Sequence, residues 1–266
     1  PVLGVSGAAI ATVIAQMVAT SLFVLEARRR PELFARLNFF TKPDLAYVKK
    51  MFKMGLPMSI QSAFFTLISM TIARIISDWG PMAIAVQRVG GQIEQISWLT
   101  AGGFQSAMSA FTGQNYGAKL GQRVYRGYFV GLGIVAAIGT FATLLLTLGA
   151  EHLFGIFIPE PDVIALGASY LKIIGISQLP QAVEILTSGA FIGLGRTTPP
   201  SVVGISLNLL RIPFALILSA TLLGLDGVWW AISISSILKG VVLSVWYLRF
   251  MNSNREMLDL RMERVA

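Results

Sequence analysis

The stretch MAIAVQRVGGQIEQISWLTAGGFQSAMSAFTGQNYGAK, residues 82–119, decides how this chain is interpreted. It is long enough to cross a bilayer, since about 20 helical residues suffice. At roughly 100° per residue, a helical wheel gathers its polar side chains into one stripe. The stripe holds Gln87, Gly91, Glu94, Trp98, Gly102 and Gln105, and Arg88, Gln92 and Gln95 widen it. Polar groups at membrane depth face water or protein rather than lipid, so the stretch predicts a helix beside a water-filled pathway.

The composition is that of a polytopic membrane protein. Hydrophobic residues make up 55% of the 266 residues, charged residues make up 13%, and the mean hydropathy is +0.70. The net charge of +8 does not indicate nucleic-acid binding, because the basic residues collect between apolar runs. The absence of cysteine excludes disulfides, thiolate metal sites and cysteine nucleophiles.

The apolar runs predict an all-α, polytopic membrane helical bundle with seven transmembrane helices. The predicted spans are residues 4–25, 56–77, 82–113, 127–149, 163–194, 201–223 and 227–248, the fifth interrupted by Pro180. Lys and Arg alternate strictly between successive connections: residues 26–54 hold eight and residues 78–81 none. The positive-inside rule therefore predicts that the connector 26–54 and the C-terminus are cytoplasmic. The second part of this connector is expected to form an interfacial helix that contacts membrane lipids.

Five charged residues fall at predicted membrane depth, where each needs a reason because a charge there costs about 2.5–3.5 kcal/mol or more. They are Glu94, Lys172, Glu184, Arg211 and Lys239. The two acids are candidates for coupling to a proton or to Na⁺, because a conformational cycle can change their surroundings. No other metal site and no cofactor is expected. The alternative is that the acids only neutralise structural cations, and Arg88, Arg211 and Lys239 are assigned to charge balance.

Glu184 repeats the pattern of Glu94. Ser177, Gln181, Glu184 and Ser188 share one helical stripe, and Pro180 lies one turn before the acid. A helix broken by proline exposes carbonyl groups that can help to bind a cation. Trp98, one turn from Glu94, is the candidate for contacting an organic cation through its ring face.

Several segments together resemble the multidrug and toxic compound extrusion (MATE) transporters. They are AVQRVGGQIEQISWLTAGGFQSAMSAFTGQNYGAK at 85–119, GLPMSIQSA at 55–63, GAFIGLGRTTPPS at 189–201 and GVSGAAIATVIAQ at 4–16. The resemblance implies that residues 1–25 are the last helix of an N-terminal lobe and residues 26–54 the connector between lobes. It implies that residues 55–250 are a complete six-helix C-terminal lobe and residues 251–266 a cytoplasmic tail. The rest of the N-terminal lobe is then expected to be missing from this half of a twelve-helix transporter.

The resemblance also implies a function and a site. The function is an antiporter of a prokaryotic cytoplasmic membrane, which exports cationic or amphipathic compounds in exchange for Na⁺ or H⁺ by alternating access. The family's coupling carboxylates commonly lie in the first and fourth helices of this lobe. Here the first of these helices has Gln61 at a plausible site position, and Glu184 lies about one turn from the expected position, Gln181. The substrate cavity is expected to include Gln61, Gln87, Gln92, Gln95, Trp98, Gln181 and Asn208.

Three other functions stay open at this point. A flippase for lipid-linked oligosaccharides would use basic residues such as Arg88, Arg211 and Lys239 to meet a pyrophosphate. An intramembrane enzyme is not expected, because the acids of the outer connections, Glu151 among them, are isolated and no catalytic His-bearing motif occurs. A purely structural scaffold would leave the polar stripe of residues 87–105 without a reason.

Overall fold

All regular structure in the described part of the chain is helical. The computed structural model describes residues 4–29 and 44–254. Its contacts divide the chain into two compact units, residues 1–49 and 50–266. Every regular element in the described residues is a helix, which confirms the predicted fold class.

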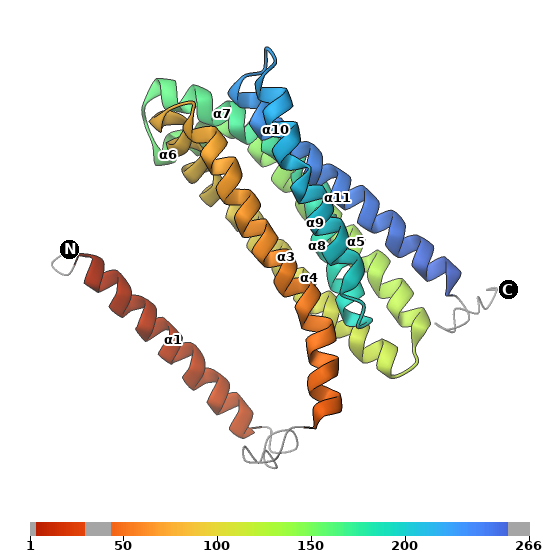
Figure 1. Ribbon diagram of the computed structural model, residues 1–266. Helices are drawn as coiled ribbons and strands as arrows, with labels where there is room; N and C mark the ends of the chain where they lie inside the picture. Colours follow the sequence, from red (N-terminus) through yellow and green to blue (C-terminus); the bar gives the residue numbers. More distant parts are fainter. Residues whose placement is uncertain (1–3, 30–43, 255–266) are drawn as a thin grey trace. The chain divides into compact units, whose positions relative to one another are not determined.

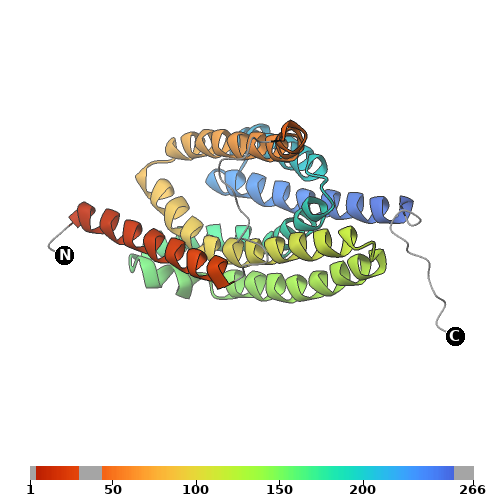
Figure 2. The same ribbon diagram turned by 90° about the horizontal axis from the view of Figure 1, so that it is seen from below.

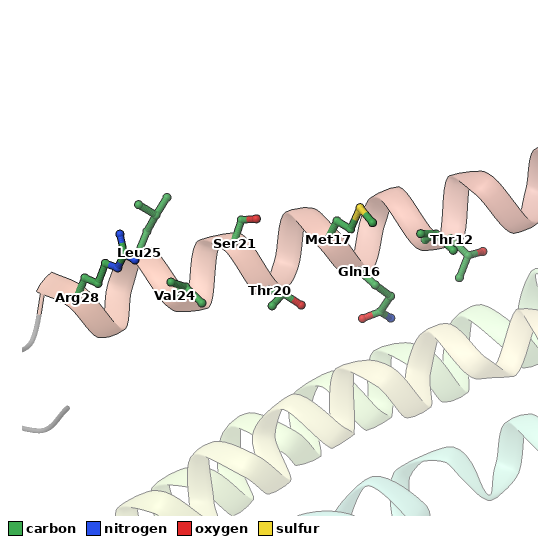
Figure 3. A pocket seen from close by; sticks show the side chains of 9 residues that line it. Thr12, Gln16, Met17, Thr20, Ser21, Val24, Leu25 and Arg28 are labelled. Carbon is green, nitrogen blue, oxygen red and sulfur yellow. The ribbon is translucent and has the colours of Figure 1, made fainter. Parts of the chain in front are cut away.

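Helix α1 (Gly4–Arg29) belongs to the first unit. Its residues Ala9–Arg29 are long and apolar enough to cross a membrane. Figure 3 shows the side chains of Thr12, Gln16 and Thr20, which border a hollow on the surface of this helix. Because every residue that borders the hollow comes from α1 itself, it is a groove in one helix and not an enclosed site.

The remaining helices form a bundle (Figure 1). They are α3 (Leu45–Ser77), α4 (Pro81–Gly117), α5 (Gly121–Leu148), α6 (Ala150–Phe157), α7 (Pro161–Ile176), α8 (Gln178–Gly193), α9 (Thr198–Leu209), α10 (Arg211–Ser219) and α11 (Leu225–Ser253). By length and hydropathy, five stretches of the described residues can cross a membrane: Ala9–Arg29, α3, α5, Thr198–Ser219 and α11. The bent pair α7–α8 makes a sixth if it counts as one span. The 37-residue α4, whose polar stripe lowers its hydropathy, is long enough to be the seventh.

Helix α8 is central to the bundle and packs most extensively against α4, α5 and α11. Figure 2 shows α3 on the side of α9 and α10, α4 with α5 on the opposite side, and α11 between them. On the α3 side, Ile68, Ile72 and Ile76 pack against α10 and α11 in one hydrophobic cluster. Because α8 lies inside the bundle, its polar residues face protein neighbours.

Glycine brings α8 into backbone contact with its neighbours. A Cβ at Gly189 would lie 2.4 Å from the carbonyl oxygen of Gln105 on α4. A Cβ at Gly240 on α11 would lie 2.3 Å from the carbonyl oxygen of Pro180 on α8. Such approaches exclude any side chain, so these glycines fix α8 against both helices.

The sequence predicts that the fifth span is interrupted at Pro180. In the structure the break lies three residues earlier, at Ser177. Helices α7 and α8 meet there at 46°. Proline has no N–H and its ring collides with the carbonyl four residues earlier, so Pro180 acts on Ile176. The chain turns at the next residue, Ser177, whose backbone N–H and hydroxyl both donate to the Ile174 carbonyl, at 3.0 and 2.8 Å. The sixth span likewise has a break, between α9 and α10 at Leu210, three residues before Pro213.

The connector differs from the prediction where the structure describes it. Helix α3 begins at Leu45 and continues to Ser77, so residues 45–55 extend the predicted span. Asp44 starts this helix, because its carboxylate accepts a hydrogen bond from the Ala46 N–H at 2.9 Å. Residues 30–43 of the connector and residues 255–266 of the tail lie outside the described residues. The domain boundaries and the interfacial position of the connector stay predictions.

Candidate functional site

A polar cavity of about 400 Å³ lies between α3, α4, α8, α9 and α11. Four of the residues predicted for a substrate cavity line it: Gln61, Trp98, Gln181 and Asn208. Glu184 and Lys239 also line it. The bundle therefore brings polar side chains from five helices to one cavity, although the first and the last of them, Gln61 and Lys239, are more than 175 residues apart in sequence.

Glu184 and Lys239 form a buried ion pair in this cavity. The Lys239 Nζ lies 3.7 Å from the Glu184 Oε2, and the two side chains are only 8% and 10% exposed. Removing either partner would leave the other charge buried and uncompensated, which is strongly unfavourable. With both groups ionised, the pair adds no net charge to the cavity.

Two amide oxygens of the cavity have no hydrogen-bond partner among residues 4–29 and 44–254. They are the Gln61 Oε1 and the Asn208 Oδ1, both buried. Gly204 on α9 makes room for Gln61, since a Cβ there would lie 2.4 Å from the Gln61 amide nitrogen. Buried carbonyl oxygens normally accept a hydrogen bond, so these two are available to a donor or a cation in the cavity.

Glu94 lies behind the cavity and is held by neutral donors. Its Oε1 accepts hydrogen bonds from the Trp98 Nε1 at 2.9 Å and the Gln178 Nε2 at 3.3 Å. Its Oε2 accepts one from the Tyr170 hydroxyl at 3.4 Å. Among the described residues, no cation lies within ion-pair distance of Glu94. Trp98 touches both the cavity and this acid, so it connects the two.

Arg211 is buried near both acids but bonds to neither. Its guanidinium donates to the hydroxyls of Ser235 at 2.6 Å and Ser236 at 2.9 Å. It is close enough to Glu94 and Glu184 to interact with both electrostatically. This arrangement is compatible with its predicted role in charge balance, which no contact here tests.

The other predicted residues of α4 lie outside the cavity. Gln87 accepts a hydrogen bond from the Trp229 indole at 3.0 Å. Gln92, Gln95 and Arg88 are exposed in the described part of the chain, because the opposite face, with Val86 and Ile93, packs into the core. A helical wheel finds a polar face but does not say which side of it meets the neighbouring helices.

Lys172, which the sequence places at membrane depth, is not buried among protein side chains. It pairs with Glu151 of α6 at 3.1 Å, and the two side chains are 51% and 70% exposed. The sequence did not reveal the hydrogen-bond partners of two predicted residues. Tyr170 and Gln178 bond to Glu94, and the serine pair of α11, Ser235 and Ser236, bonds to Arg211. The serines had a signal, since SISS at 233–236 places hydroxyls together in an apolar span that faces Arg211.

No cluster in the described residues is built to hold a resident metal ion. Within these ranges, no group of three or more His, Cys, Asp or Glu side chains has the required arrangement. The site instead has one ion pair, several neutral amides and an indole. Such a set can bind an organic cation or a monovalent ion by exchange of partners.

Comparison with known proteins gives a consistent result. The sequence pattern of the MatE family matches residues 57–217. The chain is 28% identical over 235 residues to "Probable multidrug resistance protein NorM" of Thermotoga maritima, covering 86% of this chain and 50% of that protein. It is 24% identical over 251 residues to "Multidrug export protein MepA" of Staphylococcus aureus, covering 93% of this chain and 55% of that protein.

The fold has solved counterparts as well. The crystal structure of MATE in the bent conformation superposes with a TM-score of 0.82 at 22% identity, covering 97% of this chain and 58% of that one. The chain thus spans between half and three-fifths of the length of these relatives.

Proposed function

The chain belongs to the MatE family, and from this premise we propose that the full-length protein exports cationic or amphipathic organic compounds across the membrane. The observation that carries the proposal is the cavity that Glu184 lines together with an indole and several amides. Trp98 supplies an aromatic face there, and Gln61, Gln181 and Asn208 supply amides. Organic cations are bound by such combinations of a carboxylate and an indole ring.

The proposed transport is secondary and active, in exchange for Na⁺ or H⁺. Glu184 lines the cavity, while Glu94 is coupled to it through Trp98. Either acid is suited to exchanging a cation, since an intramembrane carboxylate is costly unless it is used or neutralised. Alternating access requires a second lobe that moves against this one, so we propose that both lobes are needed for transport.

We further propose a prokaryotic cytoplasmic membrane as the location, with the connector 26–54 and the C-terminus on the cytoplasmic side. The alternation of Lys and Arg between connections supports this orientation. Drugs, membrane lipids and the N-terminal lobe are the proposed partners, and no cofactor is proposed.

A lipid flippase is not favoured by the site. Pyrophosphate recognition requires cations that are free to meet it, but Lys239 is paired with Glu184 and Arg211 is bonded to two serines. The matched relatives carry the names of multidrug resistance and export proteins. An enzymatic role has no support in the site or in these names.

The test is ethidium transport by the full-length protein into inverted membrane vesicles, with a Na⁺ gradient and a pH gradient imposed separately. We expect transport under at least one gradient, and its loss in Glu184→Gln. Glu151→Gln is the matched control, because Glu151 is an exposed acid that also pairs with a lysine. No transport under either gradient contradicts the proposed function, and undiminished transport by both Glu94→Gln and Glu184→Gln contradicts the site.

A further inference from the structure

Lys239 is held beside Glu184 by the packing of its own helix. The next residue, Gly240, lies against the backbone of Pro180, where a Cβ would be 2.3 Å from the carbonyl oxygen. Pro180 precedes Glu184 by one helical turn on α8. The contact therefore fixes the backbone of α11 next to the turn that carries the acid, and the lysine side chain needs only to extend into the cavity.

The Lys239 ammonium group lies in a cavity whose oxygen atoms are suitable ligands for a monovalent cation. It is next to a carboxylate oxygen, in a cavity that also has two unpartnered amide oxygens, the Gln61 Oε1 and the Asn208 Oδ1. Hard cations prefer carboxylate and amide oxygens as ligands. Within the described residues, Lys239 is the sole cation at ion-pair distance from Glu184.

We propose that the ammonium group of Lys239 is a built-in substitute for a monovalent cation at Glu184, and that it excludes Na⁺ from this cavity. An arriving organic cation displaces the lysine from the carboxylate, and the lysine returns to it when the compound has left. The inference rests on the proposed function and sharpens it. Of the two exchange ions proposed, it removes Na⁺ as a partner at Glu184.

Na⁺ binding by the purified full-length protein tests this directly. Radioactive Na⁺ alone is the probe, and equilibrium dialysis counts the ions bound per protein. We expect Lys239→Ala to bind one more Na⁺ than the unchanged protein does. We expect this extra ion to be absent in the double variant Lys239→Ala/Glu184→Gln. Counting the difference makes the result independent of any Na⁺ bound elsewhere in the protein.

Lys172→Ala is the matched control. It also removes a lysine from a glutamate, but both side chains of this pair are more than half exposed. We expect no additional Na⁺ in this variant. Lys239→Arg keeps a cation at Glu184, so it should also bind no additional Na⁺.

Thermal unfolding gives a second readout if Lys239→Ala folds poorly. A ligand that binds the folded state raises the melting temperature. NaCl should therefore raise the Tm of Lys239→Ala by a few degrees relative to a Na⁺-free buffer without organic cations. It should not do so for the unchanged protein or for the double variant. A Lys239→Ala protein that folds only in Na⁺ supports the proposal equally.

Two outcomes overturn the proposal. The first is a Lys239→Ala protein that binds no extra Na⁺ and gains no stability from it. The second is Na⁺ binding by the unchanged protein that is lost in Glu184→Gln. Both concern ion binding by purified protein, so they are distinct from a failure of ethidium transport, which contradicts the proposed function itself.

Discussion

Two lysine–glutamate pairs within residues 44–254 have the same chemical groups in opposite surroundings. Lys172 and Glu151 are closer, at 3.1 Å, but more than half of each side chain is exposed. Lys239 and Glu184 are farther apart, at 3.7 Å, but are almost completely buried. The exposed groups of the first pair do not depend on each other, whereas in the second pair each charge depends on the other for compensation. Burial, rather than distance, is therefore expected to decide which pair contributes more to stability and transport.

The largest effect is expected from Lys239→Ala in a medium without Na⁺. It leaves Glu184 buried without its cation and should lower the free energy of unfolding by about 3–5 kcal/mol. Thermal unfolding of the purified full-length protein in a Na⁺-free buffer without organic cations measures this. The double variant Lys239→Met/Glu184→Gln should recover most of the loss, because it removes both charges. A single variant as stable as the unchanged protein would contradict the dependence of one charge on the other.

A smaller effect is expected from Gly240→Val, which acts on the pair through the backbone. The added side chain has no room beside the Pro180 carbonyl, so α11 must shift away from α8. Overpacking of this kind typically costs about 1–3 kcal/mol of stability. Thermal unfolding measures the cost, and Gly133→Ala is the control. A Cβ at Gly133 meets no atom within 4 Å, so that variant should be neutral or slightly stabilising.

Trp98→Phe tests the connection between the cavity and the second acid. It removes the hydrogen bond to the Glu94 Oε1 but keeps an aromatic ring beside the cavity. Tyr170 and Gln178 still donate to Glu94, so the expected loss of stability is only about 1 kcal/mol. The KM for ethidium should rise if the indole also contacts the compound. Trp246→Phe, at an exposed position on α11, should change neither quantity.

The smallest effect is expected from Lys172→Ala, which removes the cation of the exposed pair. Exposed ion pairs contribute about 0–1 kcal/mol, and the Glu151 side chain is 70% exposed even with the lysine in place. Unfolding and ethidium transport should both stay near the values of the unchanged protein. A loss comparable to that of Lys239→Ala would show that exposure does not separate the two pairs.

The fold was predictable because membrane insertion depends mainly on apolar runs, which the sequence displays directly. The break in the fifth span was placed three residues too late, because proline acts on the carbonyl of the preceding turn and not at its own position. The partner of Lys172 was not predictable either. The position of a residue along a span does not show that a short helix, α6, brings Glu151 beside it.

The site was predictable only in part, because polar residues in apolar spans reveal candidates but not their partners. Gln61, Gln181 and Asn208 stood out and do line the cavity. Gln92 and Gln95 stood out equally but lie on the exposed side of α4, since the neighbours of a helix come from distant sequence. The pairing of Glu184 with Lys239 depends on the contact of Gly240 with Pro180. The hydrophobic periodicity of a helix does not predict such a contact with another helix.

The glycine contact between α8 and α4 has a mechanical consequence. Where two backbones touch, no side chains lie between the helices that could rotate to let them slide. We therefore expect α4 and α8 to move together as one rigid unit. In the fifth and sixth spans, bending is then expected where the helical hydrogen bonds are already interrupted, at Ser177 and Leu210. Glu184 lies on α8 between the break at Ser177 and the contact at Gly189, so we expect it to keep its position relative to α4 when the fifth span bends.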